Sequence, residues 1–382
     1  MVATAFRVRK FWFRLVMVIA GVCVLATGGA FAYLQQPLFG ALPSGERLER
    51  IAQSSNYVDG AFRNQIPTPM RTTKQSEWSM WVETILGEKG HPRPSGPVPT
   101  DKTDLKALDR NQDLVVWLGH SSYFVQLDGR RILIDPVFSI DASPIPFTNT
   151  AFEGSSIYSA EDMPQIDFLL ISHDHYDHLD YPSIRALKPK VRQVIAGLGV
   201  GAHFEAWGYN PDIVREADWY ETIDHAPGFQ ILVTPARHFS GRTFTRDQSL
   251  WVGFALVTAD RRLLFSGDSG YGPHFAEIGR RYGPFDWVTL DSGQYDPRWA
   301  NVHMNPEQAA QAASDLRAQV LVPGHVGRFS LSPHDWDDPF KRITVASQGR
   351  GYALWTPEIG QTMHLDGRPH NFSAWWLSAH QD

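Results

Sequence analysis

Short apolar runs bounded by glycine, proline or acidic residues recur along the chain from about residue 111 onward. Their lengths are typical of buried strands, and an alanine-rich stretch over residues 308–317 predicts a helix before the last of them. The predicted strands cover residues 131–134, 166–171, 229–237, 262–267 and 318–324. Because strands and helices alternate in this way, we expect an α/β fold, and more specifically an αββα sandwich.

Each predicted strand is followed by side chains that bind divalent metal ions well. The strand at 166–171 leads into the most informative turn of the chain, which reads His173-Asp174-His175-Tyr176-Asp177-His178. The other strands lead to Asp135, His238, Asp268 and His325. One such residue after a strand is usually a cap or a turn residue, but the whole series indicates one site along one edge of the sheets. Imidazole and carboxylate groups are typical zinc ligands, and the turn after residue 171 supplies two pairs of them, which suggests two metals.

The order of these residues along the chain resembles that of the metallo-β-lactamase-fold hydrolases. Within that superfamily, residues 117–122, 134–139 and 303–307 are similar to the N-acylphosphatidylethanolamine-hydrolysing phospholipase D branch and its bacterial relatives. The resemblance covers about residues 40–345 and implies a dizinc phosphodiesterase of phospholipase D type that acts on N-acylphosphatidylethanolamine-like phospholipids. One stretch departs from the branch, which often has His-Trp-Gly-Thr where this chain has His325-Val326-Gly327-Arg328. The departure keeps the metal ligand and changes its neighbours.

The same resemblance implies a set of ligands for two zinc ions. The first ion would be held by His173, His175 and His238, the second by Asp177, His178 and His325, and Asp268 would bridge both. Counted roughly, two zinc ions bring four positive charges, while Asp177, Asp268 and a metal-bridging hydroxide remove three, which leaves about one. A phosphodiester suits this field, and the bridging hydroxide would be the nucleophile.

Further residues are expected to support these ligands. Tyr176 and His303, together with the metal-binding Asp177 and Asp268, are the predicted catalytic residues. We expect Tyr176 and His303 to contact the phosphate or to protonate the leaving group, with simple packing as the alternative. Outside the metal ligands, the expected supporting residues are Asp135, Asp174 and His120. Asp135 would accept a hydrogen bond from a ligand histidine or shape a turn. Asp174 would support a metal ligand from outside or form the loop, and His120 would lie beside the ligands or in the core.

The amino terminus predicts a membrane segment. Four basic residues, Arg7, Arg9, Lys10 and Arg14, precede the uncharged stretch Leu15–Leu34, which is long enough to cross one bilayer. The positive-inside tendency then places the catalytic domain in the bacterial periplasm, held to the inner membrane by a single pass. The alternative is a signal peptide cleaved near Ala32, because Ala30-Phe31-Ala32 has the small-x-small form of a cleavage site.

We therefore divide the chain into an anchor or signal peptide over residues 1–34, an extension over 35–110 and a catalytic domain over 111–382. The extension is punctuated by prolines, and we expect it to wrap the core. A short apolar helix is predicted over residues 76–86, where Trp78 and Trp81 would pack on the core or contact lipid.

Charge and cysteine content limit the classes of partner and of cross-link that the chain can have. The net charge of −6 and the lack of a basic block argue against nucleic acid as a partner, whereas a phospholipid or another phosphodiester and the membrane itself are the expected partners. The single cysteine, Cys23, excludes an intrachain disulfide. Two alternatives remain open from the sequence: a lactonase or other ester hydrolase on the same dizinc core, and a metal-stabilised envelope protein without turnover.

Overall fold

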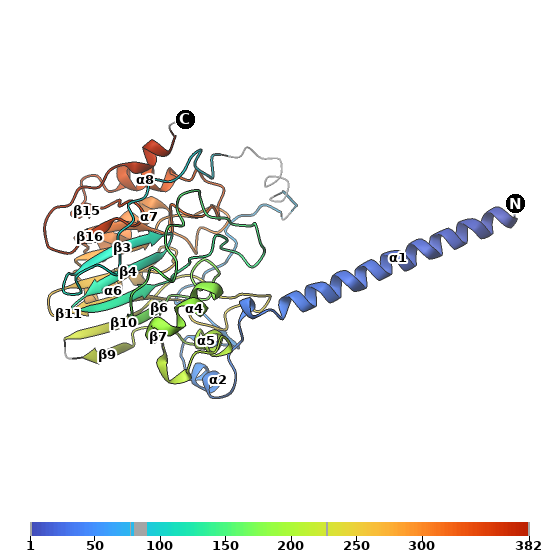
Figure 1. The fold of residues 1–382 in the computed structure, drawn as a ribbon, viewed down its shortest axis with the longest axis horizontal. Helices are drawn as coiled ribbons and strands as arrows, with labels where there is room; N and C mark the ends of the chain where they lie inside the picture. The colour runs from blue at the N-terminus through green and yellow to red at the C-terminus, as the bar shows by residue number, and fades with distance from the viewer. Residues whose placement is uncertain (1, 77, 80–89, 227, 381–382) are drawn as a thin grey trace.

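Two mixed seven-stranded sheets pack face to face in the computed structural model, which describes residues 2–76, 78–79, 90–226 and 228–380 (Figure 1). The first sheet has the order β16-β3-β4-β5-β6-β7-β8, with bounds Thr362–His364, Leu114–Gly119, Ser122–Leu127, Arg130–Ile134, Ile166–Ile171, Val191–Gly197 and Val214–Ala217. The second has the order β15-β14-β13-β12-β11-β10-β9, with bounds Ala353–Leu354, Val320–Gly324, Trp287–Asp291, Arg262–Phe265, Val252–Thr258, Phe229–Pro235 and Thr222–Ala226.

The core lies between the sheets because their strands are apolar on the facing side. Phe168 of β6 stacks on Phe229 of β10 with ring centroids 5.9 Å apart, and one buried cluster contains residues from both sheets. Strands β5 to β8 run parallel in the first sheet, as do β12 to β15 in the second. The carboxyl ends of parallel strands share one edge of a sheet, so the loops that follow them gather there.

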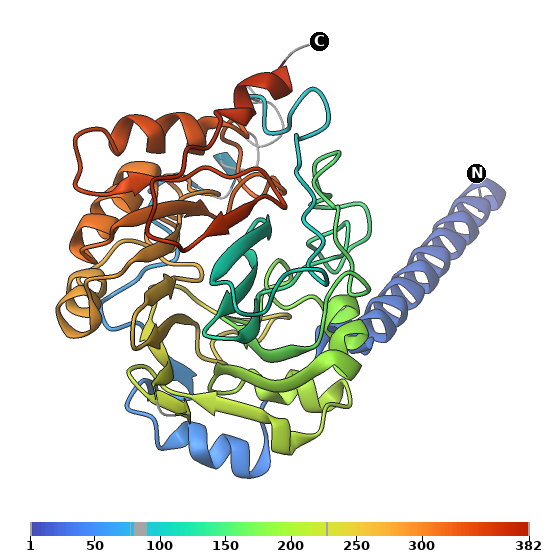
Figure 2. The same cartoon turned by 60° about the vertical axis from the view of Figure 1, so that its left-hand side comes forward.

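Helices cover the outer face of each sheet. The first sheet packs against α4 (Tyr181–Leu187) and α5 (Gly201–Ala206), and the second against α6 (His274–Tyr282), α7 (Pro306–Asp315) and α8 (Asp338–Ala346). Figure 2 shows the green helices of the first group and the orange to red helices of the second on different flanks of the strands. The predicted αββα sandwich is confirmed.

Local sequence explains where these elements begin and end. Strand β6 has the predicted bounds, 166–171. The predicted helix at 308–317 is displaced by two residues, because α7 begins after an Asn305 cap whose side chain accepts from the Gln308 backbone N–H, with Pro306 in the first turn. The helix ends before Arg317, which has a positive φ of 57°. The sequence therefore predicts the helix correctly but places both of its ends two residues too late.

The extension before the sandwich is tied to it at several points. It contains η1 (Pro37–Phe39), α2 (Gly45–Ala52), β1 (Tyr57–Val58) and β2 (Ala61–Phe62). Ile51 of α2 lies in the core cluster, and the Asn64 side chain donates to the backbone carbonyl of His238 at 2.8 Å. The helix predicted over 76–86 lies mostly outside the described residues; Trp78, which is described, is exposed.

Helix α1 (Val2–Leu34) projects away from the sandwich (Figure 1). Its segment Lys10–Leu34 is long and apolar enough to cross a membrane, and it lies near the amino terminus, where a signal sequence has the same properties. The remaining short helices are η2 (Lys188–Lys190), η3 (Pro211–Ile213) and η4 (Trp375–His380).

Candidate metal centre

Side chains from three strand ends form a first cluster. His173 and His175 lie in the turn after β6, His238 follows β10 and Asp268 follows β12. Nδ1 of His175 lies 2.9 Å from Nε2 of His173 and 3.2 Å from Nε2 of His238. Asp268 Oδ2 lies 3.7 Å from the Nε2 atoms of both His173 and His238. The structure thus brings together the residues predicted for the first ion.

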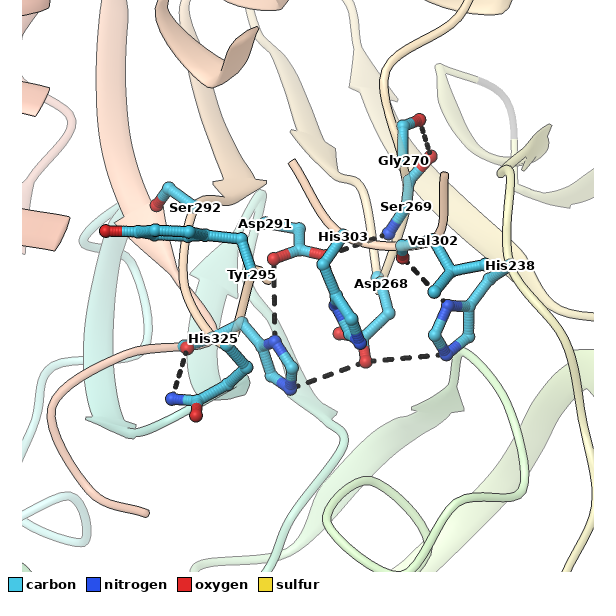
Figure 3. Close-up of polar contacts among 12 residues, drawn as sticks. His238, Asp268, Ser269, Gly270, Asp291, Ser292, Tyr295, Val302, His303 and His325 are labelled. Carbon is cyan, nitrogen blue, oxygen red and sulfur yellow. Dashed lines mark hydrogen bonds and ion pairs between the residues drawn. The ribbon is translucent and has the colours of Figure 1, made fainter. Parts of the chain in front are cut away.

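A second buried cluster contains His120, Asp177, His178 and His325. Asp177 Oδ2 lies 2.9 Å from His120 Nε2 and 3.1 Å from His325 Nε2. Asp268 Oδ1 lies 3.1 Å from His178 Nε2, and Asp268 Oδ2 lies 3.4 Å from His325 Nε2. One carboxylate therefore reaches both clusters, and Figure 3 shows it between His238 and His325.

The polar atoms of the two clusters fit bound cations. Three ring nitrogens converge in the first cluster, and because a neutral imidazole has one donor and one acceptor, mutual hydrogen bonds cannot satisfy all of them. Two ligands of a tetrahedral zinc ion, each at about 2.05 Å, are roughly 3.3 Å apart, which is close to this spacing. In the second cluster, His178 Nε2 and Asp268 Oδ1 are buried without a hydrogen-bond partner although they are 3.1 Å apart. The nitrogen and oxygen donors are those that zinc accepts.

Burial and neighbouring charges shift the histidine pKa values in opposite directions in the two clusters. Burial, reinforced by the neighbouring His178, lowers the pKa of His173 well below its ordinary value, and burial does the same to His238. Burial also opposes the charged form of His178, but the carboxylates of Asp268 and Asp177 outweigh it and raise the pKa of His178 well above its ordinary value. The pKa of His325 is raised to about 10 for the same reason, chiefly by Asp268. Without metal, the lowered pKa values favour neutral imidazoles at His173 and His238, whereas the raised pKa values favour protonated imidazoles at His178 and His325.

Outer hydrogen bonds orient the imidazoles. Asp135 Oδ2 lies 2.8 Å from His178 Nδ1, and Asp135 also accepts from the Ser172 backbone N–H at 2.7 Å. His238 Nδ1 lies 3.0 Å from the Val302 carbonyl, which accepts only if that nitrogen carries the proton. Both contacts engage Nδ1, so the Nε2 atoms of His178 and His238 face the clusters. The role expected of Asp135 stays a prediction, with this geometry in its favour.

Asp291 is a site residue that the sequence reasoning missed. It ends β13, and its Oδ2 lies 2.8 Å from His303 Nδ1 and 3.1 Å from the Ser269 backbone nitrogen, which donates to it. Its Oδ1 is buried 3.5 Å from His325 Nδ1. The His303 ring stacks on His325, with centroids 4.9 Å apart and planes 15° from parallel (Figure 3). The signal was present, because residues 287–291 form another apolar run that ends on a carboxylate.

Two residues of the metal-binding turn point elsewhere. The Tyr176 hydroxyl donates to the Arg242 carbonyl at 2.5 Å, its ring lies 4.1 Å from the Arg242 guanidinium, and burial raises its pKa to about 12. Asp174 accepts from the Gly241 backbone N–H at 2.7 Å and from Ser249 Oγ at 3.0 Å. These contacts fix the loop at residues 240–249 rather than the clusters.

Arg328, at the departure from the resembled branch, also turns away from the clusters. Its buried guanidinium donates to the backbone carbonyls of Val137 and Ser139, and burial lowers its pKa to about 10. It therefore supports the loop after β5, and the metal ligand His325 keeps its place beside it.

A pocket opens beside the clusters. Its volume is about 480 Å³, and its lining includes His303 and Val302, which contact His325 and His238 of the clusters. The rest of the lining combines apolar side chains with arginines: Met70, Arg71, Phe239, Arg246, Gln294, Arg298, Trp299 and Leu331. A second cavity of about 450 Å³ adjoins His238 and Phe239. Apolar walls with a few basic groups suit an amphipathic anion.

Comparison with known proteins agrees with this geometry. Residues 130–326 match the model of the beta-lactamase superfamily domain. An uncharacterized protein of Mycobacterium tuberculosis is 36% identical over 328 residues, which cover 85% of this chain and 88% of that protein. An N-acyl-phosphatidylethanolamine-hydrolyzing phospholipase D of Caenorhabditis elegans is 32% identical over 238 residues, 58% of this chain and 65% of its own length.

Among solved structures, a metallo hydrolase of the archaeon Ignicoccus hospitalis has the same fold, with a TM-score of 0.50, 23% identity, and coverage of 66% of this chain and 97% of its own. The family match spans every residue of the two clusters except His120. The chain belongs to the metallo-β-lactamase superfamily and is a metal-dependent hydrolase.

Proposed function

We propose that the protein is a dizinc phosphodiesterase of phospholipase D type that acts on N-acylphosphatidylethanolamine-like phospholipids. The observation that carries the proposal is the Asp268 carboxylate, which lies within 3.7 Å of ring nitrogens in both clusters. The C. elegans relative bears the name of a phospholipase with this substrate. The pocket beside His303, with its apolar walls and arginines, supports an amphipathic anionic substrate.

Seven side chains would hold the two zinc ions. His173, His175 and His238 would hold one zinc ion, Asp177, His178 and His325 the other, and Asp268 would bridge them. Bound zinc supplies a water that ionises near neutral pH and positive charge for the phosphoryl oxygens.

The surrounding groups would orient the ligands and the substrate. Asp135 holds the His178 ring, and His120 lies within hydrogen-bond distance of Asp177. Asp291 holds His303 in the lining of the pocket, where His303 can contact the phosphate or give a proton to the leaving alcohol.

For the cell, we propose that α1 stays in the inner membrane as a single anchor and that the catalytic domain faces the periplasm. The support is the apolar segment Lys10–Leu34 with basic residues before it. The domain would then meet its lipid substrate at the membrane surface.

A substrate panel tests the reaction. The zinc-loaded full chain in detergent or vesicles should release phosphatidic acid from N-acylphosphatidylethanolamine, should cleave a soluble phosphodiester more slowly and should leave acyl lactones intact. Asp268→Ala is the control, because it removes the carboxylate shared by both clusters. Faster turnover of a lactone than of any phosphodiester would replace this proposal with a lactonase.

A further inference from the structure

Two aromatic side chains stand almost entirely in solvent on the folded domain. Phe147 is 92% exposed and Phe244 is 91% exposed, more than any other large hydrophobic residue among those that the structure describes. Phe147 lies in the turn between the bridged residues Asp141 and Thr150, and exposed Ile140 and Ile145 lie beside it in sequence. Single exposed apolar residues are ordinary, but such groups gathered on one side of a domain usually mark a surface that binds something.

Residues at the end of helix α1 and just after it contact the loops that carry both phenylalanines. The Tyr33 hydroxyl donates to the Pro144 carbonyl in the first loop. In the second loop, Arg242 is buried and lies two residues before Phe244. Its guanidinium donates to the Leu38 carbonyl at 2.7 Å. Both loops therefore contact residues 33–38, where the chain passes from the predicted membrane anchor into the domain. Figure 1 shows α1 leaving the domain.

The Phe244 loop borders the pocket beside the metal clusters, because Phe239 and Arg246 line it and bracket Phe244 in the chain. The Phe147 loop is connected to the same pocket through one lining residue. Leu331 lines the pocket and packs against a buried cluster that includes Ala142 and Ala151, at the base of the Phe147 loop. Arg246 is exposed at this rim, where its charge would meet anionic headgroups.

We propose that the Phe147 loop and the Phe244 loop form a second membrane contact, which docks the mouth of the pocket onto the bilayer so that a lipid can enter without crossing water. The surface is called the docking loops below and comprises residues 140–147 and 243–246. This inference rests on the proposed lipid substrate and anchor, and it adds how the site meets the membrane. Apolar side chains beside a basic one suit the interface between headgroups and acyl chains.

A depth probe tests the docking directly. Cys23 is the only cysteine, so Cys23→Ala allows one fluorescent label at Phe147→Cys or Phe244→Cys in the full chain. In vesicles of phosphatidylethanolamine and phosphatidylglycerol, acyl-brominated lipids should quench both probes at least about threefold more than a probe at Val345→Cys. Val345 is the matched control because it is an exposed apolar residue, 65% exposed, on helix α8. Equal quenching at all three positions would overturn the proposal.

Turnover gives a second readout. Phe147→Ser with Phe244→Ser should lower hydrolysis of vesicle phospholipid about tenfold and leave a soluble phosphodiester unchanged, whereas the paired leucine variants should retain vesicle activity. Equal loss on both substrates would overturn the docking role. The quenching measurement needs no catalysis, so quenched probes without phospholipid turnover would support the docking loops and contradict the proposed reaction.

Discussion

Asp291 Oδ2 lies 2.8 Å from His303 Nδ1, so a carboxylate at the end of β13 fixes a ring that lines the pocket beside the clusters. The same carboxylate accepts from the Ser269 backbone N–H, one residue after Asp268. The position of His303 is thereby linked to the loop of the residue that reaches both metal clusters.

Replacing this carboxylate should lower turnover without emptying the metal centre. We expect Asp291→Asn to reduce kcat roughly 10- to 100-fold, the range seen when outer partners of site residues are removed. Zinc content should stay at the wild-type value. Ser292→Ala is a matched control, because Ser292 is the next residue, is buried and bonds only weakly to carbonyls at 3.3 Å. Wild-type turnover in Asp291→Asn would show that His303 needs no such support.

Metal content should follow the two clusters. The wild-type chain should bind about two zinc ions, and Asp268→Ala should leave less than about one, because its carboxylate contacts ring nitrogens in both clusters. His325→Ala should lose only the second ion. Elemental analysis after dialysis at fixed free zinc measures both variants, and equal zinc in Asp268→Ala and wild type would contradict the bridging role.

The two ions should also leave at different pH. His178 and His325 have raised pKa values, His325 to about 10, so protons compete with metal for the second cluster throughout the neutral range. The pKa values of His173 and His238 are lowered, so these two imidazoles of the first cluster stay neutral and available to metal. As pH falls from about 8 to about 6 at fixed free zinc, the second ion should dissociate first, with a plateau near one ion. Simultaneous loss of both ions would contradict the difference between the clusters.

Tyr176 should matter more for stability than for turnover. Its hydroxyl already donates to the Arg242 carbonyl, and burial raises its pKa to about 12, so its proton is held. Tyr176→Phe should lower the free energy of unfolding by about 1 kcal/mol, the value of one hydrogen bond, and change kcat by less than about threefold. A hundredfold loss of kcat in the folded variant would restore the predicted role of Tyr176 as a proton donor.

The anchor orientation has its own test. A periplasm-specific reporter enzyme fused after residue 382 should be active, because the proposed topology keeps the basic residues that precede the apolar stretch Leu15–Leu34 in the cytoplasm. Exchanging Arg7, Arg9, Lys10 and Arg14 for serine should reduce that activity. A fusion active only in the cytoplasm would reverse the proposed topology.

The strands and most site residues could be predicted because their signals are local. An apolar run and the polar residue that ends it are adjacent in sequence, which is why 166–171 was placed correctly and why His173 and His238 could be assigned to one edge. Asp291 carries the same local signal and was overlooked, since its relevance appears only through contact with His303.

Side-chain contacts between segments far apart in the chain could not be predicted from the sequence. Nothing near Tyr176 indicates that its hydroxyl faces Arg242, 66 positions away. Arg328 is similar: its place three residues after His325 does not indicate that its partners are the carbonyls of Val137 and Ser139 on another loop. Side-chain direction depends on the packed fold, and hydrophobic periodicity does not encode it.

The place where α1 joins the domain bears on what signal cleavage would do. Residues 10–32 are exposed, whereas Tyr33 already reaches Pro144 and Phe39 is buried against Tyr176. The candidate cleavage site after Ala32 falls at this border, so a cut there would keep every one of those contacts. An uncleaved enzyme would search for its substrate in two dimensions and a cleaved one in three, each with the same metal centre.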